Sequence, residues 1–153
     1  MGQYVSAAFA IVLLALVTVS GMSLAGAFEA RATLSAITVM AAADMAIDGG
    51  YTSAVQSAIQ SALTAHGLTG TASVSVSVPA DADGDGDTAG TTAYYGDTYT
   101  VSITYDLPVA LPGGALSIPV TTSAPGVSTY PCTAVSAAAG NCAAPAAIPG
   151  GSV

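Results

Sequence analysis

The stretch that decides the fold is MGQYVSAAFAIVLLALVTVSGMSLAGAF, residues 1–28, which contains no charged side chain. It reads as one long helix rather than as a set of short strands. Such a helix would be about 42 Å long, more than the roughly 30 Å hydrocarbon thickness of a bilayer. A core helix is usually amphipathic, whereas this one has no polar face. The sequence therefore predicts a helix that is covered by a membrane or by other copies of itself.

A secretory signal peptide is the alternative interpretation of this segment. The apolar stretch is longer than the usual h-region of about 7–15 residues, no Lys or Arg precedes it, and the helical pattern continues past any cleavage site. Membrane segments also normally carry Lys or Arg on the cytoplasmic flank. We therefore interpret the chain as the mature form of a processed protein.

Charge and composition restrict the function. The 153 residues include 9 acidic side chains and a single basic one, Arg31, which gives a formal net charge of −8. Nucleic acid and acidic lipid headgroups are poor partners for this chain, because both require a basic patch. Charged residues make up 7% of the chain, and Ser, Thr, Ala and Gly dominate the remaining polar and small positions. Such a hydroxyl-rich surface suits an extracellular environment.

The apolar helix is expected to continue through an alanine-rich segment to residue 48. Glu29 and Arg31 are its first charges, and their spacing of two places them on different faces of one helix. Between neighbouring copies they could form an inter-subunit ion pair that fixes stagger and register. In that case Arg31→Ala should weaken assembly. Alternatively, both residues mark where the helix leaves the apolar layer.

A small α+β head domain, residues 49–122, is expected to follow the helix. Ser53 and Gln56 fit a capping box, and a shorter amphipathic helix is predicted from Ser53 to His66. Alternating Val or Ile and Ser or Thr then predict antiparallel strands. These strands are expected at residues 71–78, 94–106 and 116–122, with a loop at 107–114 and with Pro119 on an edge strand.

Residues 123–153 are rich in Ala, Pro, Gly and Ser and predict an extended C-terminal arm. Cys132 and Cys142 lie in this arm, and Gly140 and Asn141 provide turn residues between them. A disulfide requires the two Cα atoms to lie about 4.4–6.8 Å apart, and its presence would indicate an oxidising, exported location. Free thiols or half of a metal site are the alternatives, and no second ligand pair supports a metal.

An acidic loop between the first two strands is a candidate calcium site. It contains Asp81, Asp83, Asp85 and Asp87, with Gly86 at the sixth position, as at the start of an EF-hand loop. The bidentate Glu is missing, since the twelfth position is Thr92, and no helices flank the loop. The sequence leaves two interpretations open, a looser Ca²⁺ site and a solvated turn built from Asp and Gly.

Catalytic chemistry has little support in the sequence. The chain has one His, one Arg, no Lys and no Trp, and no nucleophile triad, phosphate-binding loop or dinucleotide-binding glycine pattern is present. His66 lies at the expected end of the second helix, where a cation interacts favourably with the helix dipole. We therefore do not expect an enzyme, and apart from calcium we expect no cofactor.

The order of these parts resembles that of type IV pilin-like and TadE-like pilus subunits. Val5 departs from the type IV pattern, which usually has Glu at the fifth mature position. The resemblance implies a lollipop-like subunit that polymerises through its N-terminal helix, residues 1–48, and displays the β-domain outside. The local likenesses to TadE-like proteins are residues 31–50, 96–105 and 111–114.

Three functions remain open at this point. The first is the repeating structural subunit of an extracellular pilus filament, a homopolymer that resides in the inner or cytoplasmic membrane before assembly. The second is a single-pass, membrane-anchored pseudopilin-like component of a secretion or assembly machine. The third is an exported adhesion module that uses Ca²⁺ to contact a host or abiotic surface.

Overall fold

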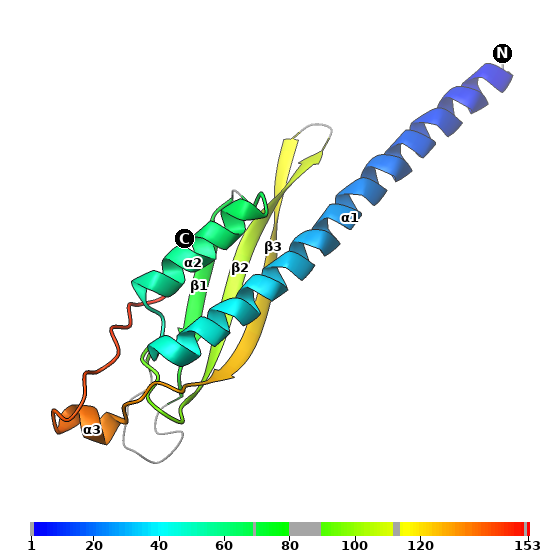
Figure 1. Cartoon of the computed structure of the whole chain (residues 1–153). Coiled ribbons are helices and arrows are strands. Elements are labelled where there is room, and N and C mark those ends of the chain that lie inside the picture. Colours follow the sequence, from blue (N-terminus) through cyan, green and yellow to red (C-terminus); the bar gives the residue numbers. More distant parts are fainter. Residues whose placement is uncertain (1, 69, 80–89, 112–113, 152) are drawn as a thin grey trace.

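The computed structural model contains six helices and strands in the part of the chain that it describes, namely residues 2–68, 70–79, 90–111, 114–151 and 153. The elements are α1 (Gly2–Asp48), α2 (Ser53–Ala65), β1 (Ala72–Ser77), β2 (Thr98–Leu111), β3 (Gly114–Val127) and α3 (Ala134–Ala138). The C-terminal half of α1 packs on a small sheet, and its N-terminal half projects away as a single rod (Figure 1). The predicted α+β class, with a long apolar N-terminal helix and a small antiparallel sheet, is confirmed.

The C-terminus of α1 is set by two glycines. Gly49 has a φ of 76°, a left-handed conformation that glycine adopts without steric cost. The amides of Gly49 and Gly50 both donate to the carbonyl of Met45, at 3.0 and 3.2 Å, so that the last turn keeps its hydrogen bonds. This end turns the chain back toward the sheet.

The predicted capping box of α2 is wrong by one residue. Thr52, not Ser53, is the N-cap, and its hydroxyl accepts a hydrogen bond from the amide of Val55 at 3.3 Å. The same hydroxyl donates to Asp48 at 3.0 Å and thereby links the two helices. Thr and Ser are both good N-cap residues, so sequence alone does not choose between adjacent candidates.

The sheet has the strand order β1-β2-β3, with antiparallel pairing throughout. β2 and β3 are each 14 residues long and form one hairpin, so the predicted loop at 107–114 is wrong. Leu107 pairs with Ile118 and Val109 pairs with Leu116, which continues the apolar alternation toward the tip. β3 also extends to Val127, beyond the predicted end at residue 122.

Three prolines fit into this hairpin because their positions need no amide donor. Backbone nitrogens two residues apart in a strand point to the same side. The amide of Asp106 donates to the carbonyl of Thr71 on the β1 side, so the nitrogen of Pro108 also points to that side. Pro108 lies beyond the residues that pair with β1, so no ladder hydrogen bond is lost there. The alternation that follows from the register places Pro119 and Pro125 with their nitrogens on the open edge of β3. The predicted edge position of Pro119 is confirmed, and a proline inside a strand is tolerated there.

The end of the chain covers the other edge of the sheet. The amide of Val74 donates to Gly151 at 2.9 Å, and that of Val153 donates to Ala72 at the same distance. Gly150 lies so close to β1 that an added Cβ would stand 2.5 Å from the carbonyl oxygen of Val74. The segment predicted as an extended arm therefore begins inside β3 and returns to pair with β1.

The core lies between the two long helices and one face of the sheet. α1 contributes Leu34, Ile37 and Met45, and α2 contributes an i, i+4, i+8 stripe. A polar contact also joins α1 to the sheet: the hydroxyls of the buried Thr38 and the half-buried Thr122 lie 2.6 Å apart. The buried side chains that face them from α2 and the sheet are Val55, Ile59, Leu63, Val74, Tyr99, Val101, Ile103, Tyr105 and Ala124.

Two tyrosines are buried in this core with different hydrogen bonding. The hydroxyl of Tyr99 donates to the carbonyl of Ala42, inside α1. The hydroxyl of Tyr51 has no hydrogen-bond partner among the described residues. Burial raises the pKa of Tyr99 to about 12 and raises the pKa of Tyr51 above its ordinary value of 10.0. Both phenols therefore remain neutral in the folded protein.

Tyr51→Phe is expected to leave the free energy of unfolding unchanged or to raise it by about 1 kcal/mol, since it removes an unsatisfied buried hydroxyl. Tyr99→Phe makes the same chemical change but removes a hydrogen bond, and it should cost about 1 kcal/mol. Thermal unfolding of the full chain in detergent, followed by circular dichroism, compares the two. A larger loss in Tyr51→Phe than in Tyr99→Phe would contradict this assignment.

Alkaline pH is expected to destabilise the head. A tyrosine whose pKa is raised by folding contributes full stability below its unfolded value of 10.0, and this contribution is lost as pH rises toward about 12. The expected loss for Tyr99 is about 1.4 kcal/mol per pH unit within that window. Denaturant titrations at increasing pH measure the slope. Tyr99→Phe should reduce the slope to the part that Tyr51 contributes, and an equal slope in both proteins would rule out Tyr99 as a source.

Candidate assembly surface

The N-terminal part of α1, residues 6–18, exposes apolar side chains on all sides. The hydroxyl of Thr18 donates to the carbonyls of Leu14 and Ala15, at 3.0 and 2.9 Å, so even this polar group is satisfied within the helix. Consecutive residues of a helix point in different directions, so no face of this part is polar. The exposed large side chains here are Phe9, Ile11, Val12, Leu13, Leu14, Leu16 and Val17.

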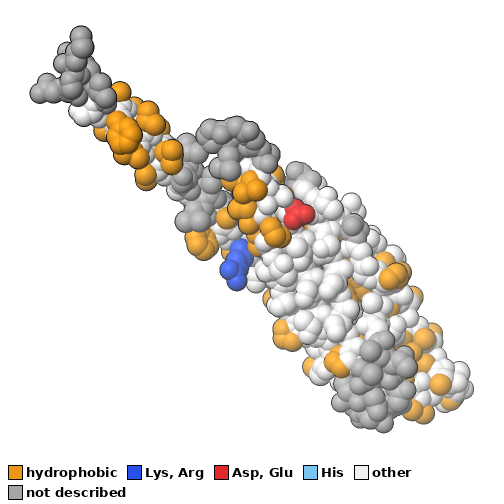
Figure 2. Space-filling view, turned by 180° about the vertical axis from the view of Figure 1, so that it is seen from behind, with side chains coloured by type: hydrophobic (Ala, Val, Ile, Leu, Met, Phe, Trp, Pro, Cys, Tyr) orange, Lys and Arg blue, Asp and Glu red, His pale blue; other side chains and the backbone are white. Residues whose placement is uncertain are grey.

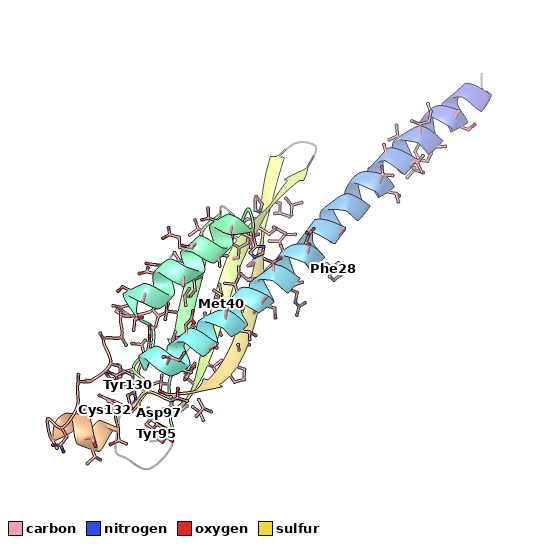
Figure 3. All side chains as sticks on the ribbon, in the orientation of Figure 1. Phe28, Met40, Tyr95, Asp97, Tyr130 and Cys132 are labelled. Carbon is pink, nitrogen blue, oxygen red and sulfur yellow. A yellow bond between two sulfur atoms is a disulfide. The ribbon has the colours of Figure 1, made fainter. Side chains whose placement is uncertain are left out.

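The part of α1 that packs on the sheet is also largely apolar on its outer side, where Glu29 and Ser35 are exposed as well. Phe28, Val39 and Ile47 are 64%, 59% and 68% exposed, although the opposite side of the same helix forms the core. Figure 3 labels Phe28 and Met40 on this part of α1. We call the following residues the outer stripe of α1, since they recur at spacings of three and four and are all exposed: Phe28, Ala32, Ala36, Val39, Met40, Ala43 and Ile47.

One helical segment of the described chain, Ala25–Asp48, is long and apolar enough to cross a membrane, with a mean hydropathy of 1.3. A shorter apolar segment covers residues 6–18. Helices from soluble cores and signal sequences pass the same test, and 33% of the longer segment's most apolar part is buried inside the protein. Membrane insertion is therefore weakly indicated.

The two charges proposed to pair between subunits are both accessible. Glu29 and Arg31 are exposed on different sides of α1, just where the helix reaches the head. Arg31, with Ala27 and Phe28, lines a shallow hollow whose other side is Pro119, Val120 and Thr121 of β3. Figure 2 shows orange hydrophobic side chains along the projecting part of α1 and a mostly white surface over the head. Both charged groups are thus available to a neighbouring molecule.

The candidate calcium ligands, Asp81, Asp83, Asp85 and Asp87, lie outside the described residues. Within the described ranges, no group of three or more His, Cys, Asp or Glu side chains could hold a metal ion. The calcium hypothesis therefore stays a prediction from the sequence.

Cys132 and Cys142 form a disulfide, with Cα atoms 6.0 Å apart. The closed loop contains α3, whose N-cap Thr133 accepts a hydrogen bond from the amide of Ser136 at 3.2 Å. The disulfide lies at the end of the head away from the projecting half of α1, near the exposed Tyr95 (Figure 3). Such a bond is typical of proteins in oxidising compartments.

The sheet face away from the helices carries hydroxyl groups. Ser73, Thr104 and Thr121 form one row across the three strands, and the hydroxyls of Thr104 and Thr121 lie 2.9 Å apart. The next row is Ser75, Ser102 and Ser123. These side chains are exposed or half-buried, so this face meets solvent.

His66 is the C-cap residue of α2, and its amide donates to the carbonyl of Ala62 at 3.2 Å. Its side chain is exposed. The predicted position at the C-terminal end of the helix therefore agrees with the structure.

The sequence interpretation missed the apolar tip of the β2–β3 hairpin, where Leu116 and Ile118 are exposed. The signal is present in the alternation of Leu107 and Val109 with these two residues, but the sequence analysis predicts a loop at residues 107–114.

Comparison of the chain with protein-family models finds no match, and comparisons with curated proteins and with solved structures find no match either.

Proposed function

We propose that this chain is the structural subunit of an extracellular pilus-like filament, a homopolymer built through residues 1–48 with the head displayed outside. The observation that carries the proposal is the exposed apolar surface of α1, which surrounds its N-terminal part and continues along the outer stripe. Exposed apolar surface of this extent marks a site of association.

The length of α1 favours other copies of the chain over a bilayer as the covering partner. The helix has 47 residues and is therefore about 70 Å long, more than twice the roughly 30 Å hydrocarbon thickness of a bilayer. If a bilayer covered the N-terminal part, Val39 and Ile47 would remain in water beside the head. Neighbouring helices in a bundle would cover both parts.

Burial of this surface supplies the driving force for assembly, at about 25 cal/mol per Å² of apolar area. A contact between different surfaces of identical subunits gives an open helical polymer when its rotation does not close a ring. The heads would then form the outer shell in a lollipop-like arrangement. The hydroxyl-rich sheet face and the Cys132–Cys142 disulfide suit such an exported, solvent-facing shell.

An ion pair between Glu29 of one subunit and Arg31 of another is expected to fix the stagger of the helices. Arg31→Ala should then reduce filament yield several-fold, and the double variant Glu29→Arg with Arg31→Glu should restore it. Filament mass per cell, measured after shearing, is the readout. An unchanged filament yield in Arg31→Ala would rule out the proposed ion pair, because the chain has no other Lys or Arg that could replace Arg31.

The second candidate is a single-pass, membrane-anchored component of an assembly or secretion machine. The segment that could span a membrane by length and composition favours it. In this case the chain would stay in the cytoplasmic or inner membrane, where the filament subunit also resides before assembly.

Electron microscopy of material sheared from the cell surface, with mass spectrometry of its protein, separates the two candidates. Filaments composed chiefly of this chain would support the structural subunit. If the chain is found intact in the membrane fraction and no filament contains it, the proposal is overturned in favour of the anchored component.

A further inference from the structure

The tip of the β2–β3 hairpin presents an apolar face that the described parts of this chain leave exposed. Leu116 and Ile118 are 52% and 41% exposed, and they pair across the hairpin with Val109 and Leu107. These four residues belong to the sheet face on which α1 packs lower down, since Leu107 and Val120 contact the core from the same side. We call them the hairpin patch.

α1 does not close over the hairpin patch. The helix runs beside the hairpin and then departs from it (Figure 1). An open hollow separates the two elements, with Ala27 and Phe28 on the helix side and Pro119 and Val120 on the strand side. α1 therefore covers this sheet face beside the core but leaves it uncovered at the hairpin patch.

The properties of the hairpin patch match those of the N-terminal part of α1. The strand segments that carry it, residues 107–111 and 114–118, contain no charged residue, and neither do residues 6–18. Each strand segment is about 17 Å long, and a helix of residues 6–18 is about 20 Å long. An apolar helix is also what the same sheet face already binds within the chain.

Building on the proposed function, we propose that the hairpin patch of one subunit binds residues 6–18 of α1 from a second copy of this chain. The incoming helix lies along the hollow between Phe28 and the hairpin. It extends the layer of helices that already covers the sheet face, and it buries apolar surface of both subunits. The β2–β3 hairpin thereby forms part of the contact between subunits.

Cysteine cross-linking in the full chain tests this contact. Both native cysteines are in the Cys132–Cys142 disulfide, so introduced thiols can be read separately. Ile118→Cys is combined with single cysteines at each position from 9 to 17, and both sheared filaments and isolated membranes are oxidised. Ser117→Cys is the matched control, because it lies on the opposite face of the same strand.

Disulfide-linked dimers with Ile118→Cys are expected at positions three or four residues apart, with at least tenfold less product for Ser117→Cys. Cross-linking at no position from 9 to 17, or equally at all of them, overturns the inference. The inference is also overturned if Ile118→Cys in lipid vesicles is protected from a water-soluble maleimide but forms no dimers. In that case the hairpin patch contacts lipid.

A second variant separates this contact from the function itself. Ile118→Ser should reduce filament yield at least tenfold, with an unchanged melting temperature of the head in detergent, since the side chain is partly exposed. Normal yield overturns the inference while the filament remains established. If the unmodified chain forms no filament, the proposed function fails, and cross-linking in membranes still decides whether the patch binds a second helix.

Discussion

Val39→Asp is expected to abolish filament formation while the head stays folded. Val39 lies in the middle of the outer stripe and is 59% exposed, so a carboxylate there meets water in the isolated subunit. In a bundle of α1 helices it would be buried without a partner, at a cost of about 3–5 kcal/mol. At about 1.4 kcal/mol per factor of ten, the association constant should fall at least about 100-fold.

Ser61→Asp provides the matched control for this prediction. It introduces the same carboxylate at an exposed helical position, on α2 rather than on the outer stripe. Filament yield should remain near that of the unmodified chain, and both variants should unfold at the same temperature in detergent. Normal filaments from Val39→Asp would show that the outer stripe is not an interface.

Gly50→Ala is expected to destabilise the head by about 3 kcal/mol or more. Gly50 has a φ of 143°, which side chains rarely allow, and an added Cβ would stand 2.4 Å from the carbonyl oxygen of Thr91. Strain and overpacking each cost about 1–3 kcal/mol. Gly50 also pairs with Thr92, so the substitution disturbs the contact between the end of α1 and the segment before β2.

Gly67→Ala separates the steric clash from the backbone strain. Gly67 also has a positive φ, 72°, but an added Cβ there would meet no atom within 4 Å. Its cost should therefore be about 1–2 kcal/mol, the cost of the left-handed conformation alone. Denaturant titration in detergent measures both variants, and equal losses would contradict the role of close packing at Gly50.

The helices and the sheet were predictable because their signals are local. The uncharged run at residues 1–28 and the alanines after it predict a helix, and the stripe of Val55, Ile59 and Leu63 predicts a second one. Alternating valines and serines place the strands to within a few residues. The exact cap of α2 was not predictable, because Thr52 and Ser53 have the same capping chemistry.

Two parts of the fold depend on distant residues and were therefore missed. Pro108 is tolerated in β2 because β1 ends before it, which the sequence around the proline does not reveal. Gly151 and Val153 cover the edge of β1 through backbone hydrogen bonds, and an Ala, Pro and Gly composition carries no periodic signal for this.

The candidate assembly surface was only half predictable. The uncharged run indicates a helix that needs a covering partner, and Glu29 and Arg31 could be selected because charges are rare. The outer stripe beside the head could not be separated from the core in advance, because both sides of α1 are apolar there. Contact with the sheet determines which side of α1 is buried, namely the side that carries Leu34, Ile37 and Met45.

A helical reconstruction of the sheared filaments by electron cryomicroscopy would show directly whether α1 forms the centre of the filament. We predict a central bundle of α1 helices, with Val39 and Ile47 buried between subunits and with the hydroxyl-rich sheet face on the outside. Filaments in which the outer stripe faces solvent, or in which residues 1–48 do not form the centre, would contradict the account.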